Sequence, residues 1–220
     1  MDLRPSVDLE YLHRPTCGRH SFRRAKNEMP EGQSVQFAAR VDVSWLEPHL
    51  SKLKAEIYAY GVTRAGRRDV GDNDDQGRDV ESIWLREADR ERCPNLREDD
   101  TKRSRETARS KAFPGTMSVL AQLSTELCGA LGRAGYMVFP PSSALSAGES
   151  IGRYYCSHDR YHLILCGAAE FIFEHRDVIR MAPAEIWWVN RRKPHLVRNR
   201  SRQRQVHLVF DLLPSQGLLF

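Results

Sequence analysis

The last third of the chain is divided into short apolar runs, and their spacing constrains the fold more than any other feature. Turn residues separate the runs, which span 136–139, 161–166, 170–173, 185–189, 195–197 and 206–213. Several short strands at intervals of about 8 to 12 residues are typical of a β-sandwich or barrel. We therefore expect a mainly β domain with flanking helices, folded as a double-stranded β-helix, or jelly roll.

Two helices are expected before this region. A strand over 35–43 leads into a helix capped by Ser44, because apolar residues then recur every three or four positions at Trp45, Leu46, Leu50, Leu53 and Ile57. Gly61 would end this helix. A second helix is expected from about Thr116 to Leu131, ending near Gly132 and Gly135, with an apolar face of Val119, Leu120, Leu123, Leu127 and Leu131.

The remaining segments suggest one domain with poorly ordered additions. Residues 1–34 mix Pro, Gly, His and Arg without a sustained period and predict a partly disordered N-terminal arm. Within the domain, at 35–214, the stretch 64–110 has 25 charged residues among 47 and predicts a solvated insertion, with an apolar island at 83–85 that could form a strand. Residues 215–220 would be a short tail.

Composition narrows the function classes. The 220 residues contain no apolar window of about 18 residues and no apolar segment after Met1, so we expect a cytoplasmic protein without a membrane partner. Five cysteines without a Cys-x-x-Cys pair argue against a disulfide framework or structural zinc. The net charge is +5, but most arginines alternate with acids, so we expect no nucleic-acid partner.

Four histidines fall in the strand-rich third: His158, His162, His195 and His207. A metal site in a jelly roll draws one ligand from an early strand and another from a late strand, so a pairing of His195 with His158 or His162 is suitable. Spacing alone does not separate a metal ligand from an imidazole that only packs in the core.

Four ordered blocks carry a family resemblance. They lie at 159–165, 184–190, 194–199 and 206–211, and shorter matches precede them at 41–44, 82–86 and 147–151. Together they resemble the aspartyl/asparaginyl β-hydroxylase family, a branch of the iron(II)- and 2-oxoglutarate-dependent oxygenases that includes the cis-3-proline hydroxylases. The resemblance covers about residues 35–214 and implies a cupin-like barrel.

The resemblance also implies roles for individual residues. His195 matches the distal iron ligand, and Arg160 and His162 match the Arg-x-His pair that contacts 2-oxoglutarate. Alternation along a strand would place both members of that pair on one face. Trp187 and Trp188 match an aromatic strand and are expected to pack. The implied reaction uses O2 to hydroxylate an aspartyl, asparaginyl or prolyl unit, free or in a peptide.

Two departures from the family pattern fall on functional positions. The expected His-x-Asp is absent ahead of Asp159, which leaves His158 as the candidate proximal iron ligand; Asp159, as its strand neighbour, would point to the opposite face. The arginine expected to bind the cosubstrate falls at Gln205, with Arg204 one residue earlier. A bulge could aim Arg204 inward, Arg160 and another cation could hold the cosubstrate, or 2-oxoglutarate no longer binds.

Three functions therefore remain open. The first is an iron(II)- and 2-oxoglutarate-dependent dioxygenase. The second is a degenerate jelly roll that serves, without iron, as a binding or scaffolding module for an acidic ligand or partner. The third is a metal cupin with a site of His158, His162 and His195. A basic cluster at 191–204, with seven cations and no acid, is either a solvated hairpin or a rim that attracts acidic substrates.

Overall fold

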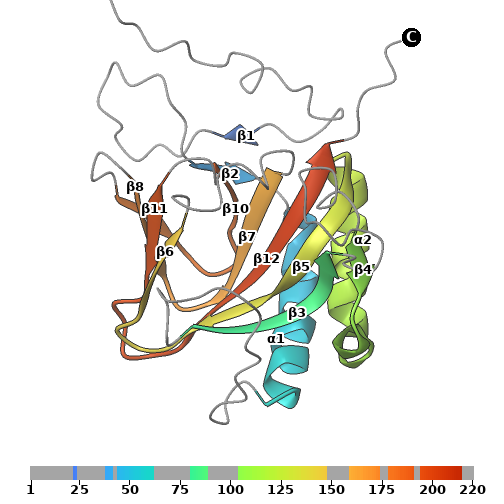
Figure 1. Ribbon diagram of the computed structural model, residues 1–220, viewed down its shortest axis with the longest axis horizontal. Coiled ribbons are helices and arrows are strands. Elements are labelled where there is room, and N and C mark those ends of the chain that lie inside the picture. The colour runs from blue at the N-terminus through green and yellow to red at the C-terminus, as the bar shows by residue number, and fades with distance from the viewer. Residues whose placement is uncertain are drawn as a thin grey trace, which may run out of the picture.

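Two antiparallel sheets face each other in the computed structural model, which describes residues 22–23, 38–41, 44–61, 80–88, 104–147, 159–173, 178–190 and 194–214 (Figure 1). The strands are β1 (Phe22–Arg23), β2 (Ala38–Val41), β3 (Glu81–Ala88), β4 (Ser104–Glu106), β5 (Gly129–Phe139), β6 (Ala144–Ala147), β7 (Asp159–Cys166), β8 (Ala169–Phe173), β9 (Val178–Met181), β10 (Ile186–Val189), β11 (His195–Arg198) and β12 (Gln205–Pro214).

The order of these strands is that of a jelly roll. The large sheet runs β1-β2-β10-β7-β12-β5-β3-β4 and the small sheet runs β6-β11-β8-β9. Between β5 and β12 the chain passes back and forth from one sheet to the other, so that each sheet receives four of these eight strands. The remaining strands only extend the large sheet at its two edges. The predicted fold class is thus confirmed.

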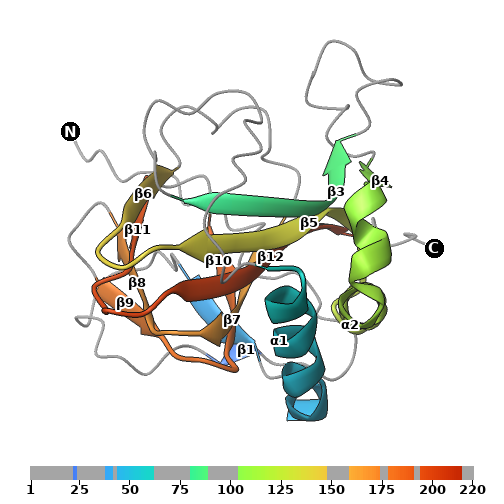
Figure 2. The ribbon, with the colours of Figure 1, turned by 90° about the horizontal axis from the view of Figure 1, so that it is seen from below.

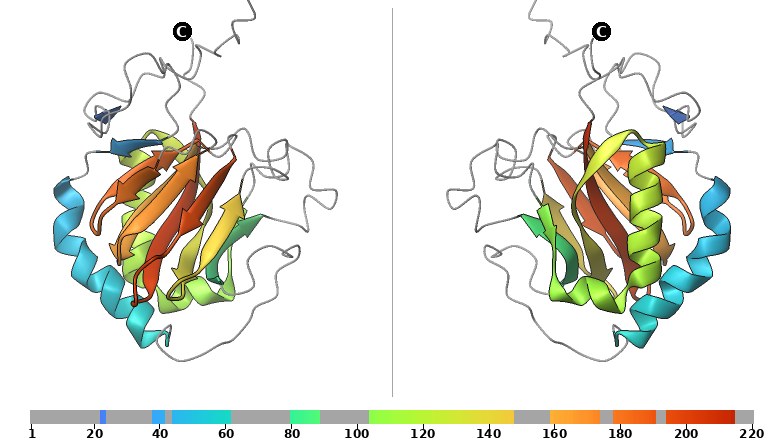
Figure 3. Two further views of the ribbon diagram at one scale, coloured as in Figure 1. Left: turned by 90° about the vertical axis from the view of Figure 1, so that its left-hand side faces the viewer. Right: turned by 90° about the vertical axis from the view of Figure 1, so that its right-hand side faces the viewer.

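Two helices cover the outer face of the large sheet. These are α1 (Leu50–Ala59) and α2 (Pro114–Glu126), preceded by the short 3-10 helices η2 (Ser44–His49) and η4 (Ala108–Ala112). Both α-helices lie on the side of the large sheet that faces away from the small sheet (Figures 2 and 3). Among the described residues, no helix has the length and apolar character needed to cross a bilayer.

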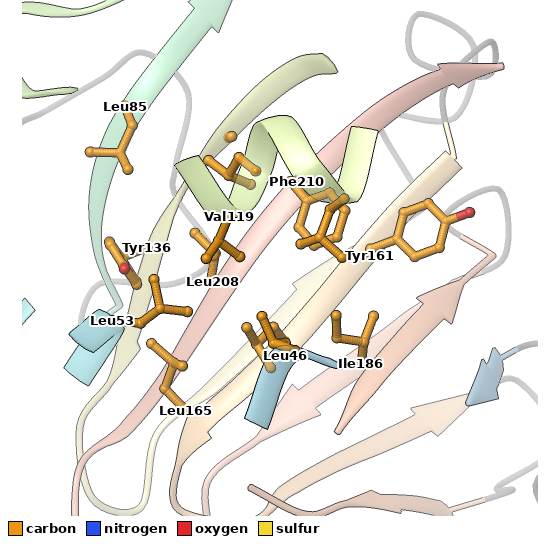
Figure 4. Packing of buried hydrophobic residues seen from close by; sticks show 14 of the residues in the cluster. Leu46, Leu53, Leu85, Val119, Tyr136, Tyr161, Leu165, Ile186, Leu208 and Phe210 are labelled. Atoms are coloured by element: carbon orange, nitrogen blue, oxygen red, sulfur yellow. The ribbon is translucent and has the colours of Figure 1, made fainter. Parts of the chain in front are cut away.

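The large sheet therefore separates two apolar cores. The outer core lies between helices and sheet, and Figure 4 shows Leu53 of α1, Val119 of α2 and Leu208 of β12 within it. The inner core lies between the two sheets and includes Phe171 and Trp187. Because successive side chains of a strand point to opposite faces, β7 and β12 place alternate residues in the outer core and on the inner face of the large sheet. The inner core is where a jelly roll can place a site.

A carboxylate fixes the two helices to each other. Glu56 of α1 lies at the N-terminus of α2, where it accepts hydrogen bonds from the backbone N–H groups of Gly115 and Thr116 at 2.5 and 2.8 Å. The Thr116 hydroxyl also bonds to Glu56, at 2.7 Å, and lies 2.6 Å from the Tyr136 hydroxyl of β5. These bonds satisfy N–H groups that the first turn of a helix leaves without partners.

Two details of the helix predictions were wrong. The first α-helix begins at Leu50 after a 3-10 turn that contains Pro48, so Ser44 does not cap it. The second ends at Glu126, and the next residues form a turn in which Cys128 has a φ of 52°. Leu131 belongs to β5 instead. The four-residue spacing of the leucines suits a helix, but the left-handed backbone at Cys128 ends it. The predicted helix stop at Gly61, with a φ of 95°, agrees with the structure.

Most strand predictions were correct, with shifted ends. All six apolar runs of the last third lie largely within strands, and the island at 83–85 lies inside β3. The short strands β1, β4, β6 and β9 were missed, because runs of two to four residues carry little periodicity. The charged stretches 62–79 and 89–103 and the N-terminal arm, apart from Phe22–Arg23, lie outside the described residues, as does 215–220.

Candidate functional site

Three histidines face the space between the two sheets. His162 comes from β7 and His207 from β12, both in the large sheet, whereas His195 comes from β11 in the small sheet. Their relative exposures are 4%, 0% and 8%. Buried imidazoles at the centre of a barrel are costly unless their nitrogens have partners, so their surroundings decide what the site can do.

His162 and His207 form a direct pair. Their Nδ1 atoms are 3.4 Å apart, and their rings meet edge to face with centroids 5.6 Å apart. One ring must donate its Nδ1–H to the Nδ1 lone pair of the other, because a hydrogen bond needs one donor and one acceptor. The two residues are 45 positions apart in the sequence and meet only because β7 and β12 are neighbours.

Phenylalanines from both sheets surround the pair. Phe171 of β8 lies with its centroid 5.1 Å from that of His162, 6.2 Å from His207 and 6.1 Å from His195. Phe139 of β5 lies 4.8 Å from His207, and Phe173 of β8 lies 5.7 Å from His195. The imidazoles therefore sit among flat aromatic walls.

These surroundings keep the paired imidazoles neutral. Burial lowers the pKa of His207 to about 3. Burial is also the main reason that the pKa of His162 lies well below its usual value; the nearby His207, Arg160 and His195 lower it further, and Asp211 opposes them. Removal from water disfavours the charged form of a histidine.

Several buried polar atoms near the pair have no hydrogen-bond partner within the described part of the chain. They are the Nε2 atoms of His162 and His207 and the Oε1 atom of Gln205, which precedes His207 by two residues on β12. The Gln205 side-chain amide N–H donates to the backbone oxygen of Ala168. Buried polar groups without partners are rare in proteins, and each calls for an explanation.

Arg160 occupies the other end of the inner face. Its Nε and Nη2 donate to the two carboxylate oxygens of Asp211, at 2.7 and 2.8 Å. The expected placement of Arg160 and His162 on one face of β7 agrees with these contacts. The guanidinium group predicted to bind 2-oxoglutarate therefore already binds a carboxylate of this chain.

Asp159 is directed away from the interior. Its Oδ1 accepts a hydrogen bond from Nε1 of Trp188, at 3.2 Å, and Trp188 packs against the outer core. Trp187, its neighbour, packs in the inner core, so both tryptophans are packing residues as predicted. The candidate ligand His158 lies outside the described residues.

Gln205 and Arg204, the two residues considered for the cosubstrate arginine, lie at or directly before the start of β12. Gln205 is the first residue of β12 and is fully buried, whereas Arg204 lies half-buried just before the strand. The register between β7 and β12 shifts next to Val206, where Ile164 and Cys166 pair with consecutive residues of β12, so the additional residue is Leu165 of β7. Because the bulge is on β7, alternation along β12 is uninterrupted here, and it places Gln205 in the same inner row as His207.

The described residues do not complete the predicted iron and 2-oxoglutarate centre. His195 fits as an iron ligand, since an imidazole on the inner face is a suitable donor. Within the described ranges, however, no group of three His, Cys, Asp or Glu side chains is placed to hold a metal ion. Arg160 is paired with Asp211, so its charge is already balanced within the chain.

His207 and Asp211 are the inner residues to which the sequence assigned no role. They lie two and six residues after Gln205 on β12, and this even spacing was visible in the sequence. Their partners on β7 were not, because the pairing of two distant strands is not encoded locally.

Comparison with known proteins gives limited matches. No family model matches the sequence, and no curated protein matches it in sequence. A prolyl-4-hydroxylase from Pseudomonas putida resembles the structure over 76% of this chain and 87% of its own, with 10% identity and a TM-score of 0.45.

Two smaller barrels are also similar. A predicted oxalate decarboxylase from Thermotoga maritima matches 49% of this chain and 76% of its own, with 12% identity and a TM-score of 0.32. A Cupin 2 conserved barrel domain protein from Salinispora arenicola matches 36% of this chain and 61% of its own, with 10% identity and a TM-score of 0.30. These likenesses concern barrel shape, so the chemistry must be argued from the residues of this chain.

Proposed function

We propose that this jelly roll is a small-molecule binding module whose site lies between the sheets, at the His162–His207 pair. One observation carries the proposal: buried polar atoms of this pair and of Gln205 have no partner among the described residues. Each such atom costs about 1–3 kcal/mol when it remains unpaired. A bound polar molecule would remove that cost.

The closed ion pair of Arg160 and Asp211 supports the same function. A site for 2-oxoglutarate needs a cation for the carboxylate, and here the Nε–Nη2 edge of Arg160 is bound to Asp211, which balances its charge. Gln205, in place of the arginine implied by the family resemblance, adds no charge. The jelly-roll packing is therefore present, whereas the contacts for the cosubstrate differ from those that the family resemblance implies. This combination is expected when a fold is retained without its original reaction.

The second candidate function is the iron(II)- and 2-oxoglutarate-dependent dioxygenase, and the inward position of His195 favours it. In that case His195 would hold iron(II) together with His158, and the loaded centre would supply hydroxylation of an aspartyl, asparaginyl or prolyl substrate with O2. His162 would then contact the cosubstrate, together with Arg160 or Arg204. This function requires Arg160 to leave Asp211, or another cation to replace it.

One titration separates the two functions. Iron(II) is added anaerobically with and without 2-oxoglutarate, and the visible charge-transfer band of the complex is followed in the wild type and in His195→Ala. The binding module predicts no band in either protein. A band that needs both components and disappears in His195→Ala would establish the dioxygenase and reject the first proposal.

A second experiment tests the binding module directly. Protein labelled with 15N at histidine is titrated with a panel of small polar molecules, both charged and uncharged, while the imidazole resonances are recorded by NMR. The proposal predicts saturable shifts of the His162 and His207 resonances with at least one compound. If no compound moves them, the interior is not a binding site.

A further inference from the structure

We infer that the site between the sheets selects an uncharged ligand that has both a hydrogen-bond donor and an acceptor, such as a carboxamide, and discriminates against carboxylates. This inference rests on the proposed function and specifies the chemical class of its ligand. It differs from the acidic ligand expected from the sequence.

The hydrogen bond within the histidine pair determines which donor and acceptor atoms a ligand would meet. The ring that donates its Nδ1–H keeps a lone pair on Nε2, whereas the ring that accepts at Nδ1 carries its proton on Nε2. Neither Nε2 has a partner in the described residues. The pair therefore presents one acceptor and one donor, whichever ring takes which role.

Gln205 adds a second acceptor. One N–H of its amide group donates to the backbone oxygen of Ala168, whereas the Oε1 atom has no partner among the described residues, and the side chain is fully buried. Along β12, Gln205 and His207 are two residues apart and project to the same face. A ligand beside them must supply at least as many N–H or O–H donors as acceptors.

Charge selection follows from the same residues. The two paired imidazoles are buried and neutral, and the charge of Arg160 is balanced by Asp211. A carboxylate beside the pair would be a buried anion with no counter-charge from these residues, which is strongly unfavourable. It would also have no proton to donate to the available acceptors. A carboxamide has a similar shape, no charge and two N–H donors.

A metal ion at the pair satisfies these atoms less well. Coordination through both Nε2 atoms would need a lone pair on each, but the hydrogen bond within the pair leaves a lone pair on only one of them. Coordination through both Nδ1 atoms would place a proton on each Nε2, and metal-bound histidines normally donate that proton to a nearby acceptor. Both Nε2 atoms lack such an acceptor in the described part of the chain. The aromatic rings of Phe139 and Phe171 beside the pair suit a flat organic group.

The matched probes acetamide and acetate test the inference. They have almost the same shape and differ in charge and in donors. Each is titrated at pH 7.5 into the histidine-labelled protein, and long-range 1H–15N spectra follow the ring nitrogens of His162 and His207. We expect acetamide to shift these nitrogens with a dissociation constant at least about tenfold smaller than that of acetate. Equal or tighter binding of acetate would overturn the inference.

A matched pair of glutamine variants locates the site. Gln205→Leu removes the buried acceptor with little change of volume and should weaken acetamide at least about tenfold, since the amide N–H loses its partner. Gln203→Leu makes the same change at an exposed position and should leave binding unchanged. Equal acetamide affinity in both variants would contradict the placement at Gln205. The wild-type titration remains decisive if Gln205→Leu does not fold.

The outcomes keep the two proposals distinct. If acetate binds as tightly as acetamide or more tightly, the interior is still a binding site and only the proposed ligand class is wrong. If neither probe moves the His162 and His207 resonances, and the wider panel also fails, ordered water alone satisfies these atoms, and both proposals are rejected.

Discussion

Arg160 and Asp211 face each other on neighbouring strands and form a two-point ion pair inside the barrel. They are register partners on β7 and β12, with N–O distances of 2.7 and 2.8 Å. The Asp211 side chain is only 3% exposed and that of Arg160 17% exposed. The pair is thus largely shielded from water, and it cancels the charge that a carboxylate ligand would otherwise use.

Removing one partner of this pair should destabilise the protein strongly. Asp211→Asn removes the carboxylate that balances the Arg160 charge, so we expect the free energy of unfolding to fall by about 3–5 kcal/mol. Urea unfolding measures this loss. The double variant Arg160→Met/Asp211→Leu should lose clearly less than the sum of its two single changes. Additive losses would show that the ion pair does not couple the two strands.

Stability should fall in acid because of the histidine pair. In the folded protein, chiefly because of burial, the pKa of His207 is about 3 and that of His162 lies well below its usual value. In the unfolded chain both histidines have a pKa of about 6.5. The unfolded state therefore binds more protons below pH 6.5. Each histidine should cost up to about 1.4 kcal/mol of stability per pH unit on lowering the pH below 6.5, and neither should affect the slope above it.

Urea unfolding at several pH values checks this dependence. His207→Phe removes one titrating ring and should flatten the acid slope by up to about 1.4 kcal/mol per pH unit. Phe139→Leu disturbs the packing beside the same ring without removing a titrating group, so its stability curve should run below that of the wild type with a similar slope. A wild-type slope in His207→Phe would refute the assignment.

The link between the helices should depend on Glu56. Glu56→Ala removes the acceptor of three hydrogen bonds at the start of α2, two of them to Thr116, which is fully buried. We expect a loss of about 1–3 kcal/mol in the free energy of unfolding. Glu47→Ala, at an exposed position of η2, should change it by less than about 0.5 kcal/mol. Equal effects would mean that Glu56 does not hold the helices together.

Close contact between β3 and β5 makes Gly135 intolerant of a side chain. A Cβ atom there would lie 2.5 Å from the backbone oxygen of Ile83 and 2.8 Å from the Cα of Trp84. Backbone atoms in a sheet cannot move aside cheaply, so Gly135→Ala should cost about 1–3 kcal/mol. Ala130→Ser, at an exposed position of the same strand, is the control and should be nearly neutral. Thermal unfolding compares the two variants.

The local sequence pattern was sufficient to recognise a strand or a helix where the apolar residues follow a single periodicity. Every second residue of the run from Val206 to Leu212 lies in the outer core, so the run could be recognised as a strand. The placement of Arg160 and His162 on one face of β7 followed from the same alternation. Leu127 and Leu131 mark the limit of this reasoning, because their spacing fits a helix although Leu131 lies in β5. The turn at Cys128 that separates the two elements has no strong sequence signal.

The sequence by itself determined the jelly-roll class, the two flanking helices and the placement of Arg160 and His162 on one face of their strand, because side-chain alternation and apolar spacing are local properties of the chain. Only the tertiary structure decided the chemistry of the interior. Arg160 meets Asp211 across 51 positions, and His162 meets His207 across 45. These contacts depend on the register of two distant strands, which packing of the whole barrel fixes. The same register turns two predicted cosubstrate contacts into members of internal pairs.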